Sequence, residues 1–213
     1  MDCSLSPGGF EMNKPYDSPW LPEPLPMNPS SPWDIITLGD LPASGGRSSM
    51  SESSEPISRF KGDYFFLSNF APSPITIDYK GEEYSMPTGE HCFQAMKIGA
   101  SEWDEWKTKS WLRHMSQAPT PSKSKYLGRS IQINVEKWNT MSYACMVRTQ
   151  KLKYNQNPEL AEKLLLTGSR TLIEGTEWGD KLWGVDEKGV GENLLGKILM
   201  SLREELTRGN PER

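Results

Sequence analysis

The segment from Gly89 to Lys97, Gly-Glu-His-Cys-Phe-Gln-Ala-Met-Lys, holds the residue types best suited to chemistry in this chain. On a helix that turns about 100° per residue, Glu90, Gln94 and Lys97 fall within one narrow stripe, with Phe93 at its edge. A carboxylate, an amide and an amine then project from the same face. An ordinary amphipathic helix turns an apolar stripe inward and spreads its charges over the solvent face. The pattern therefore predicts one wall of a small-molecule site, and the alternative is a solvated face bearing a Glu–Lys ion pair.

A second polar cluster, from Asp180 to Gly184, lies in a glycine-rich stretch that leads to Asn193. A tryptophan such as Trp183, beside glycines and a carboxylate, is typical of a platform on which a heterocycle stacks. Asn193 is expected at the N-terminus of the last helix, where backbone amides can hold a phosphate or a ribose hydroxyl. The alternative for Trp183 is simple packing in the core.

The elements that position these residues can be predicted from periodicity and turn signals. Residues 60–70 indicate a short strand that runs into an aromatic loop. Strands at 75–79 and 83–86 are expected to form a hairpin around a Lys80-Gly81 turn, and a helix begins near Glu90. Ser122 is expected to cap a short helix that ends with Gly128 as its C-terminal glycine. The remaining predictions are helices over 103–115, 135–155, 158–168 and 193–206, and a strand over 171–175.

Composition divides the chain into a tail and a domain. Residues 1–58 contain 10 of the 17 prolines and 12 serines, and they carry a formal charge of −6. Such a segment buries too little apolar surface to offset its ordering entropy, so we predict a disordered, acidic, Pro/Ser-rich tail. Two apolar islands in it, at 18–20 and 31–36, are predicted to dock on a protein partner or on the domain; the alternative is a solvated leader without a role. Residues 59–213 carry a charge of +2 and suffice for one hydrophobic core.

The composition also argues against several classes of protein. No apolar run approaches the ~20 residues of a membrane span, and the N-terminus lacks the basic start and apolar run of a signal peptide. Three cysteines without a paired framework indicate a reducing compartment, so a cytoplasmic location is expected. Two histidines without a cysteine cluster argue against a zinc site. The nearly neutral domain is not suited to non-specific duplex binding, although a nucleotide substrate is compatible with it.

An ordered set of motifs resembles the NADAR (NAD- and ADP-ribose-associated, YbiA-like) family. The resemblance runs from about Phe60 to Arg203 and leaves out the tail. Its motifs are Phe66-Leu67-Ser68-Asn69-Phe70, Glu90-His91-x-Phe93-Gln94-Ala95-x-Lys97, Lys125-Tyr126-Leu127-Gly128-Arg129, Asn157-Pro158, Leu165-Leu166-Thr167-Gly168, Asp180-x-x-Trp183-Gly184 and Gly191-x-Asn193-x-Leu195-Gly196-x-x-x-Met200-x-Leu202-Arg203.

The resemblance implies an N-glycosidase on a compact, helix-rich α+β domain with a small sheet. Family members cleave the bond between a ribose anomeric carbon and an exocyclic amine. The substrate classes are ribosylamino-pyrimidine phosphate intermediates of riboflavin synthesis, and ADP-ribose attached to guanine in nucleic acid. No metal or redox cofactor is expected.

Two mechanisms are compatible with an N-ribosyl amine, whose nitrogen lone pair can open the ring. In the first, a carboxylate activates water against an oxocarbenium-like carbon while an acid protonates the amine. In the second, which we favour slightly from the sequence, a lysine attacks the open-chain imine and forms a Schiff base. Glu90 would be the acid/base and Lys97 the nucleophile, which needs a lowered pKa.

The remaining candidates are assigned to substrate binding or to a second catalytic task. Asp180 would hydrogen-bond the ribose or aid proton transfer, and Trp183 would stack on the heterocycle. Gln94 would bind substrate or orient Glu90, and Arg129 would clamp a phosphate, unless it is a surface cation. The other expected binding residues are Phe66, Asn69, Phe70, Gly184 and Asn193, although core packing explains the two phenylalanines equally well.

Two departures from the family pattern stand out: the long tail, and Thr88-Gly89 before Glu90, where a Ser or Thr followed by an apolar residue is expected. The rival functions are a non-catalytic module that binds ADP-ribose or a related nucleotide, and an interaction protein that works through its tail. Intact Glu90 and Lys97 favour the enzyme, because sensing alone does not require this pair.

Overall fold

The computed structural model describes residues 55–177 and 179–208. The predicted tail therefore lies outside the described residues, apart from its last four positions. Among the described residues, no helix is long and apolar enough to cross a membrane.

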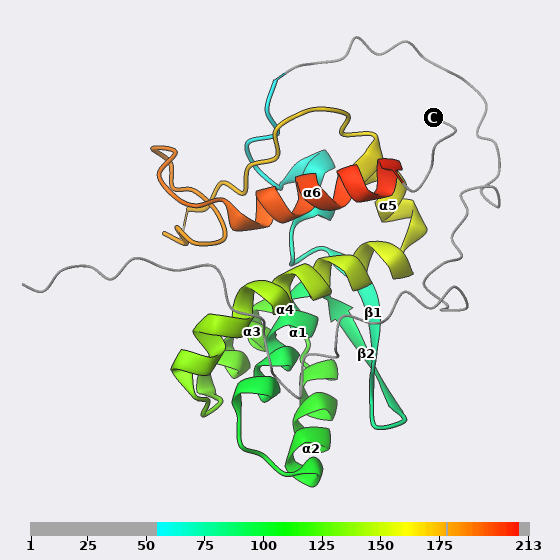
Figure 1. The fold of residues 1–213 in the computed structure, drawn as a ribbon, viewed down its shortest axis with the longest axis vertical. Helices are drawn as coiled ribbons and strands as arrows, with labels where there is room; N and C mark the ends of the chain where they lie inside the picture. The colour runs from blue at the N-terminus through cyan, green and yellow to red at the C-terminus, as the bar shows by residue number, and fades with distance from the viewer. Residues whose placement is uncertain (1–54, 178, 209–213) are drawn as a thin grey trace, which may run out of the picture. The chain divides into compact units, whose positions relative to one another are not determined.

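The sheet in the described part of the chain is a two-stranded antiparallel hairpin (Figure 1). Strand β1 (Pro72–Tyr79) pairs with β2 (Glu82–Thr88), so the hairpin predicted from the sequence is confirmed. Lys80 and Gly81 both have positive φ, 52° and 77°, as a two-residue turn that follows the twist of the strands requires. Alternation along the strands turns one side chain in two toward the core.

Helices make up most of the remainder, so the predicted helix-rich α+β class is confirmed. Figure 1 shows α4 between two groups: the hairpin, α1 and α2 on one side, and α5 and α6 on the other. The helical elements are η2 (Gly62–Leu67), α1 (Gly89–Ala95), η3 (Met96–Ala100), α2 (Glu105–Ser116), α3 (Pro121–Ser130), α4 (Val135–Gln156), α5 (Pro158–Leu165) and α6 (Leu194–Arg208), where η denotes a 3-10 helix.

Two hydrophobic clusters follow this division. Residues of η2, α4, α5 and α6, such as Leu164 and Leu199, form the first. Residues of the hairpin, α1 and α2, such as Ile75 and Leu112, form the second. Helix α4, the longest helix described, supplies Met146 to the first cluster and Leu152 to the second.

Three local predictions were wrong. Residues 62–67 form the 3-10 helix η2 rather than a strand. Helix α3 begins at Pro121 with Thr120 as its cap, since the Thr120 hydroxyl accepts from the Lys123 amide at 3.1 Å, and Gly128 lies inside it. The expected strand at 171–175 is reduced to two isolated parallel bridges, Ile57 with Leu172 and Gly175 with Val185.

His91 is buried, and hydrogen bonds of its ring link α1 to the segment that joins α2 to α3. Its Nε2 lies 3.0 Å from the carbonyl oxygen of Ala118, and its Nδ1 lies 2.8 Å from the Thr88 hydroxyl. A carbonyl can only accept, so Nε2 carries the proton and Nδ1 accepts from Thr88. Burial lowers the pKa of His91, which favours this neutral, structural form.

Candidate functional site

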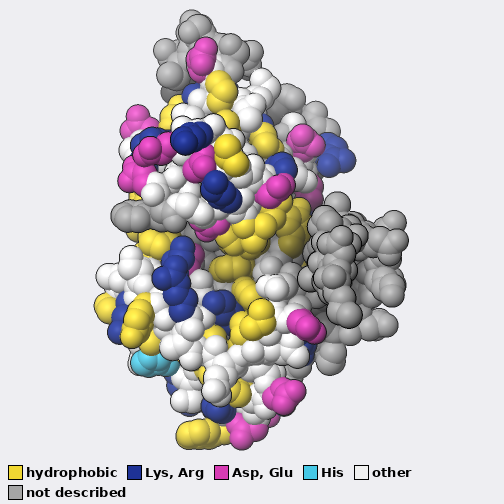
Figure 2. All heavy atoms as spheres, turned by 90° about the vertical axis from the view of Figure 1, so that its left-hand side faces the viewer, with side chains coloured by type: hydrophobic (Ala, Val, Ile, Leu, Met, Phe, Trp, Pro, Cys, Tyr) yellow, Lys and Arg dark blue, Asp and Glu magenta, His cyan; other side chains and the backbone are white. Residues whose placement is uncertain are grey.

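A pocket of about 330 Å³ gathers most of the sequence-predicted site. Its walls come from η2 and the loop after it, α1, α3, α4 and residues 174–183. Figure 2 shows the left-hand side of Figure 1, where α3 and the segment before α6 lie. Hydrophobic side chains gather across the middle of this face, with charged side chains around them. The expected site residues in the lining are Asn69, Phe70, Glu90, Gln94, Asp180 and Trp183.

Glu90 is a buried carboxyl group on the α1 wall of the pocket, with 5% of its surface exposed. Its Oε1 accepts a hydrogen bond of 2.8 Å from Nε2 of Gln94, one helical turn later. Burial raises the pKa of Glu90, against the Gln94 hydrogen bond and the charges of Lys125 and Lys97. A carboxyl group with a raised pKa is a stronger base when ionised than an exposed glutamate, as proton transfer in catalysis requires.

The loop after η2 is held against Glu90 by the backbone and by α4. The amide of Glu90 donates to the carbonyl of Asn69 at 2.8 Å. The Asn69 side chain accepts from Nε2 of Gln150 at 2.6 Å, which fixes the direction of its amide. Nζ of Lys153 donates to the carbonyls of Phe66 and Ser68, at 2.7 and 2.8 Å. The loop that carries Asn69 and Phe70 is thus held by buried side chains from α4.

Lys153 was not singled out from the sequence. It is fully buried, and burial lowers its pKa to about 7, while the charge of Glu174 acts in the opposite direction. Its chain neighbours Leu152 and Tyr154 are buried as well, but Thr149 and Gln150, one turn before it, are polar, so no apolar stripe of the sequence signals its burial.

The wall formed by residues 174–183 contains Trp183 and the carboxyl groups of Glu174 and Asp180. Oδ1 of Asp180 accepts from the amides of Leu182 and Trp183, at 3.3 and 3.1 Å, and so shapes the turn that places the indole. The ring of Trp183 packs edge-on against Phe93, with centroids 5.5 Å apart. The negative charge of Asp180 raises the pKa of both Glu90 and Glu174. Carboxyl groups from distant segments therefore influence each other across one pocket.

The lining also contains charged residues that sequence reasoning did not select. Lys125 of α3 lies with its Nζ 5.9 Å from the centroid of the Phe70 ring, and its charge acts on Glu90 and Glu174. Lys61 pairs with Glu177 at 2.7 Å on the exposed side of the pocket. Lys125 belongs to one of the motifs that carry the family resemblance, and this was the signal that could have marked it as a site residue. The sequence carries no such signal for Glu174 or Lys61.

Five expected site residues do not line the pocket. The stripe of α1 stops before Lys97, because the chain tightens into η3 at Met96. Nζ of Lys97 donates to the carbonyl of Gly128 at 2.5 Å and lies 5.5 Å from the Trp138 ring centroid. Its pKa is lowered, mainly by burial.

The other four are structural neighbours of the pocket. Arg129 is exposed on α3, and Phe66 packs against the first hydrophobic cluster. The Asn193 side chain accepts from the amide of Glu174 at 3.0 Å and donates to the carbonyl of Leu172 at 2.9 Å. Gly184 is buried against the backbone of Glu174.

Substitution of Gly128 by alanine is expected to reduce activity through Gln94. A Cβ at position 128 would lie 2.7 Å from Cδ of Gln94, at the point where α3 crosses α1. The Gln94 amide would have to leave Glu90, and overpacking of this kind costs about 1–3 kcal/mol. Glycosidase rates and thermal unfolding of Gly128→Ala, beside the exposed Ser122→Ala on the same helix, measure both effects. Wild-type values for Gly128→Ala in both assays would contradict this role.

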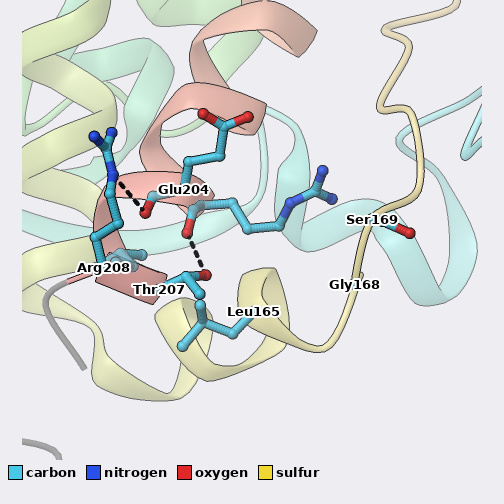
Figure 3. A pocket seen from close by; sticks show the side chains of 8 residues that line it. Leu165, Gly168, Ser169, Glu204, Thr207 and Arg208 are labelled. Carbon is cyan, nitrogen blue, oxygen red and sulfur yellow. Dashed lines mark hydrogen bonds between the residues drawn. The ribbon is translucent and has the colours of Figure 1, made fainter. Parts of the chain in front are cut away.

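A second hollow, of about 760 Å³, lies between the end of α5 and the last turns of α6 (Figure 3). Two of the polar groups drawn there bond within α6: the Thr207 hydroxyl donates to the carbonyl of Arg203 at 2.8 Å, and Nε of Arg208 donates to that of Glu204 at 3.4 Å. The Arg203 guanidinium donates to the Thr167 hydroxyl at 2.7 Å and to the Arg170 carbonyl at 3.0 Å. Its described lining contains a single carboxyl group, Glu204, and no aromatic side chain. The described part of the hollow therefore lacks the pair of carboxyl groups that glycoside hydrolysis uses. Across residues 55–177 and 179–208, no three His, Cys, Asp or Glu side chains are grouped as metal ligands.

Comparisons with known proteins show the family of the chain. A family profile described as NADAR domain matches residues 58–207. N-glycosidase YbiA of Escherichia coli is 37% identical over 145 residues, which cover 68% of this chain and 82% of that protein. Riboflavin biosynthesis protein PYRR, chloroplastic, of Zea mays is 31% identical over 147 residues, 66% of this chain and 23% of that protein. The NMR structure of E. coli YbiA superposes with a TM-score of 0.58 at 30% identity, and the match covers 77% of this chain and 97% of that one.

Proposed function

Because the chain belongs to the NADAR family and is an N-glycosidase, a hydrolase of N-glycosyl bonds, we propose that it acts on ribose attached to an exocyclic amine. The substrate classes are ribosylamino-pyrimidine phosphates of riboflavin synthesis and ADP-ribosylated guanine. The name of the maize relative supports the first class. The observation that carries the proposal is the buried carboxyl group of Glu90 inside a pocket of aromatic side chains.

The pocket has the size and lining that such a substrate needs. A volume of about 330 Å³ accommodates a ribose and one heterocycle. Trp183 and Phe70 offer ring faces to the heterocycle, and Asp180 offers a carboxylate to the ribose hydroxyls. Lys61 and Lys125 supply positive charge to a phosphate, the role that the sequence suggested for Arg129.

Attack by water is the route that the lining supports better. In this route Glu90 takes a proton from water, the water oxygen bonds to the anomeric carbon, and the carbon–nitrogen bond breaks toward the amine. A Schiff base formed by Lys97 needs its amine in the pocket, and the lining contains Lys61 and Lys125 but not Lys97. The lowered pKa of Lys97 suits a nucleophile, but its Nζ is directed to the carbonyl of Gly128.

Mass spectrometry of the two substrates tests the proposal. Wild-type protein is expected to release ribose phosphate from a ribosylamino-pyrimidinone phosphate, or ADP-ribose from ADP-ribosylated guanine. Binding without release from either would show the rival function, a nucleotide-binding module. Borohydride separates the mechanisms: an adduct that is lost in Lys97→Ala or in Lys125→Ala identifies a Schiff base and its residue, whereas no adduct with wild type supports water attack.

Two further proposals concern the cellular setting. Cys92 and Cys145 are both free and buried, which supports a reducing compartment such as the cytoplasm. A protein partner for the tail also remains a proposal, because the predicted docking segments at 18–20 and 31–36 lie outside the described residues.

A further inference from the structure

Glu174 is a carboxyl group of the pocket that the proposed reaction has not yet used. It lies on the wall formed by residues 174–183, whereas Glu90 lies on α1. Its backbone is fixed on both sides: its amide donates to Oδ1 of Asn193 at 3.0 Å, and its carbonyl accepts from the amide of Val185 at 2.8 Å. A side chain on such a held backbone is placed precisely relative to a bound substrate.

One oxygen of the Glu174 carboxyl group lacks a hydrogen-bond donor among the described residues. This oxygen, Oε2, is buried. A buried oxygen without a donor disfavours the ionised carboxylate more than the neutral acid. The Glu90 carboxylate differs, because Gln94 donates to it at 2.8 Å. The two carboxyl groups of one pocket therefore stand in different environments, which is how acid and base are separated in glycoside hydrolysis.

The charges around Glu174 come from every wall of the pocket. Asp180, on the same segment, repels a second negative charge, whereas Lys153 of α4, Lys125 of α3 and Lys61 before η2 attract it. Burial is the largest effect; with the charge of Asp180 it raises the pKa of Glu174 to about 7, against the three lysines, which lower it. The acid form is then present below pH 7 and is lost as the pH rises through this value.

We propose that Glu174 is the general acid that protonates the departing exocyclic amine. This role rests on the proposed function, with Glu90 as the base. Water gives one proton to Glu90 while its oxygen bonds to the anomeric carbon. The electron pair of the broken carbon–nitrogen bond stays on nitrogen, which takes the proton of Glu174. Solvent then reprotonates Glu174 and removes the proton from Glu90, so no other reactant is needed.

The substitution Glu174→Gln tests this role, because it keeps the size of the side chain and removes the proton. Its rate of ribose release is expected to fall about 10²- to 10⁴-fold. The wild-type rate is expected to decline above pH 7, and this decline is expected to disappear in Glu174→Gln. Glu187→Gln is the matched control, since Glu187 is an exposed carboxylate outside the pocket lining.

A series of N-ribosylanilines with increasingly acidic leaving amines separates proton donation from a structural role. The Glu174→Gln defect is expected to shrink as the amine becomes a better leaving group. The role is overturned if Glu174→Gln keeps more than a third of the wild-type rate, if it keeps the wild-type decline above pH 7, or if its defect is equal for all amines. If Glu174→Gln does not fold, a wild-type rate without a decline near pH 7 overturns the role. An inactive wild type would instead contradict the proposed function.

Discussion

Replacement of Glu90 by glutamine is expected to lower the rate of ribose release by about two to four orders of magnitude, the usual contribution of a general acid or base. Glutamine has the shape of glutamate but cannot take a proton from water. The fold should tolerate the change, because a neutral amide at a site with 5% exposure removes the cost of a buried charge, and Gln94 can still bond to it. Steady-state kinetics on the substrate that wild type cleaves, together with thermal unfolding, measure both expectations.

The matched control for this substitution is Glu83→Gln. Glu83 is an exposed carboxylate on β2, outside the pocket, so its replacement should leave the rate unchanged. A Glu90→Gln protein with more than a third of the wild-type rate would remove Glu90 from the catalytic role. A large loss of rate together with a lower unfolding temperature would indicate that Glu90 acts mainly on the structure.

Replacement of Gly184 by alanine is expected to destabilise the fold. A Cβ there would collide with the carbonyl oxygen of Glu174 and lie 2.6 Å from Cγ2 of Thr176. The nearest obstacle is backbone, which cannot rotate away as a side chain can. The Val185–Glu174 hydrogen bond would have to break, and overpacking of this kind costs about 1–3 kcal/mol or more. For a chain of this size each kcal/mol lowers the unfolding temperature by about 2–4 °C.

Activity should fall with stability in Gly184→Ala, because the same segment carries Glu174, Asp180 and Trp183. Gly189→Ala is the control: its φ of +76° makes alanine strained, but no atom lies within 4 Å of the added Cβ. A smaller fall in unfolding temperature is therefore expected for Gly189→Ala. If Gly184→Ala unfolds at the wild-type temperature but binds substrate more weakly, the expectation from the sequence, a direct substrate contact, is correct instead.

Local sequence signals predicted the start of α1 near Glu90 and the hairpin. The spacing of Glu90 and Gln94 by one turn and the two-residue turn at Lys80-Gly81 depend only on neighbours along the chain. The same reasoning failed at Lys97, because a 3-10 helix turns about 120° per residue and takes the side chain off the stripe.

The choice between Lys125 and Arg129 shows where local signals end. The two residues are one turn apart on α3, so periodicity places them on the same side of the helix. Which of them reaches the pocket depends on where α3 crosses α1, and that point is the close approach of Gly128 to Gln94. No pattern within α3 contains this information.

The sequence by itself determined the family and the helix-rich α+β class. Those properties follow from local periodicity, capping residues and an ordered set of motifs. Only the tertiary structure decided that Lys153 is buried beneath the loop after η2, and that Glu174 lines the pocket with an unpaired oxygen. Burial and electrostatic environment come from residues far apart in the chain, so the same glutamate is an ordinary surface acid in one fold and a proton donor in another.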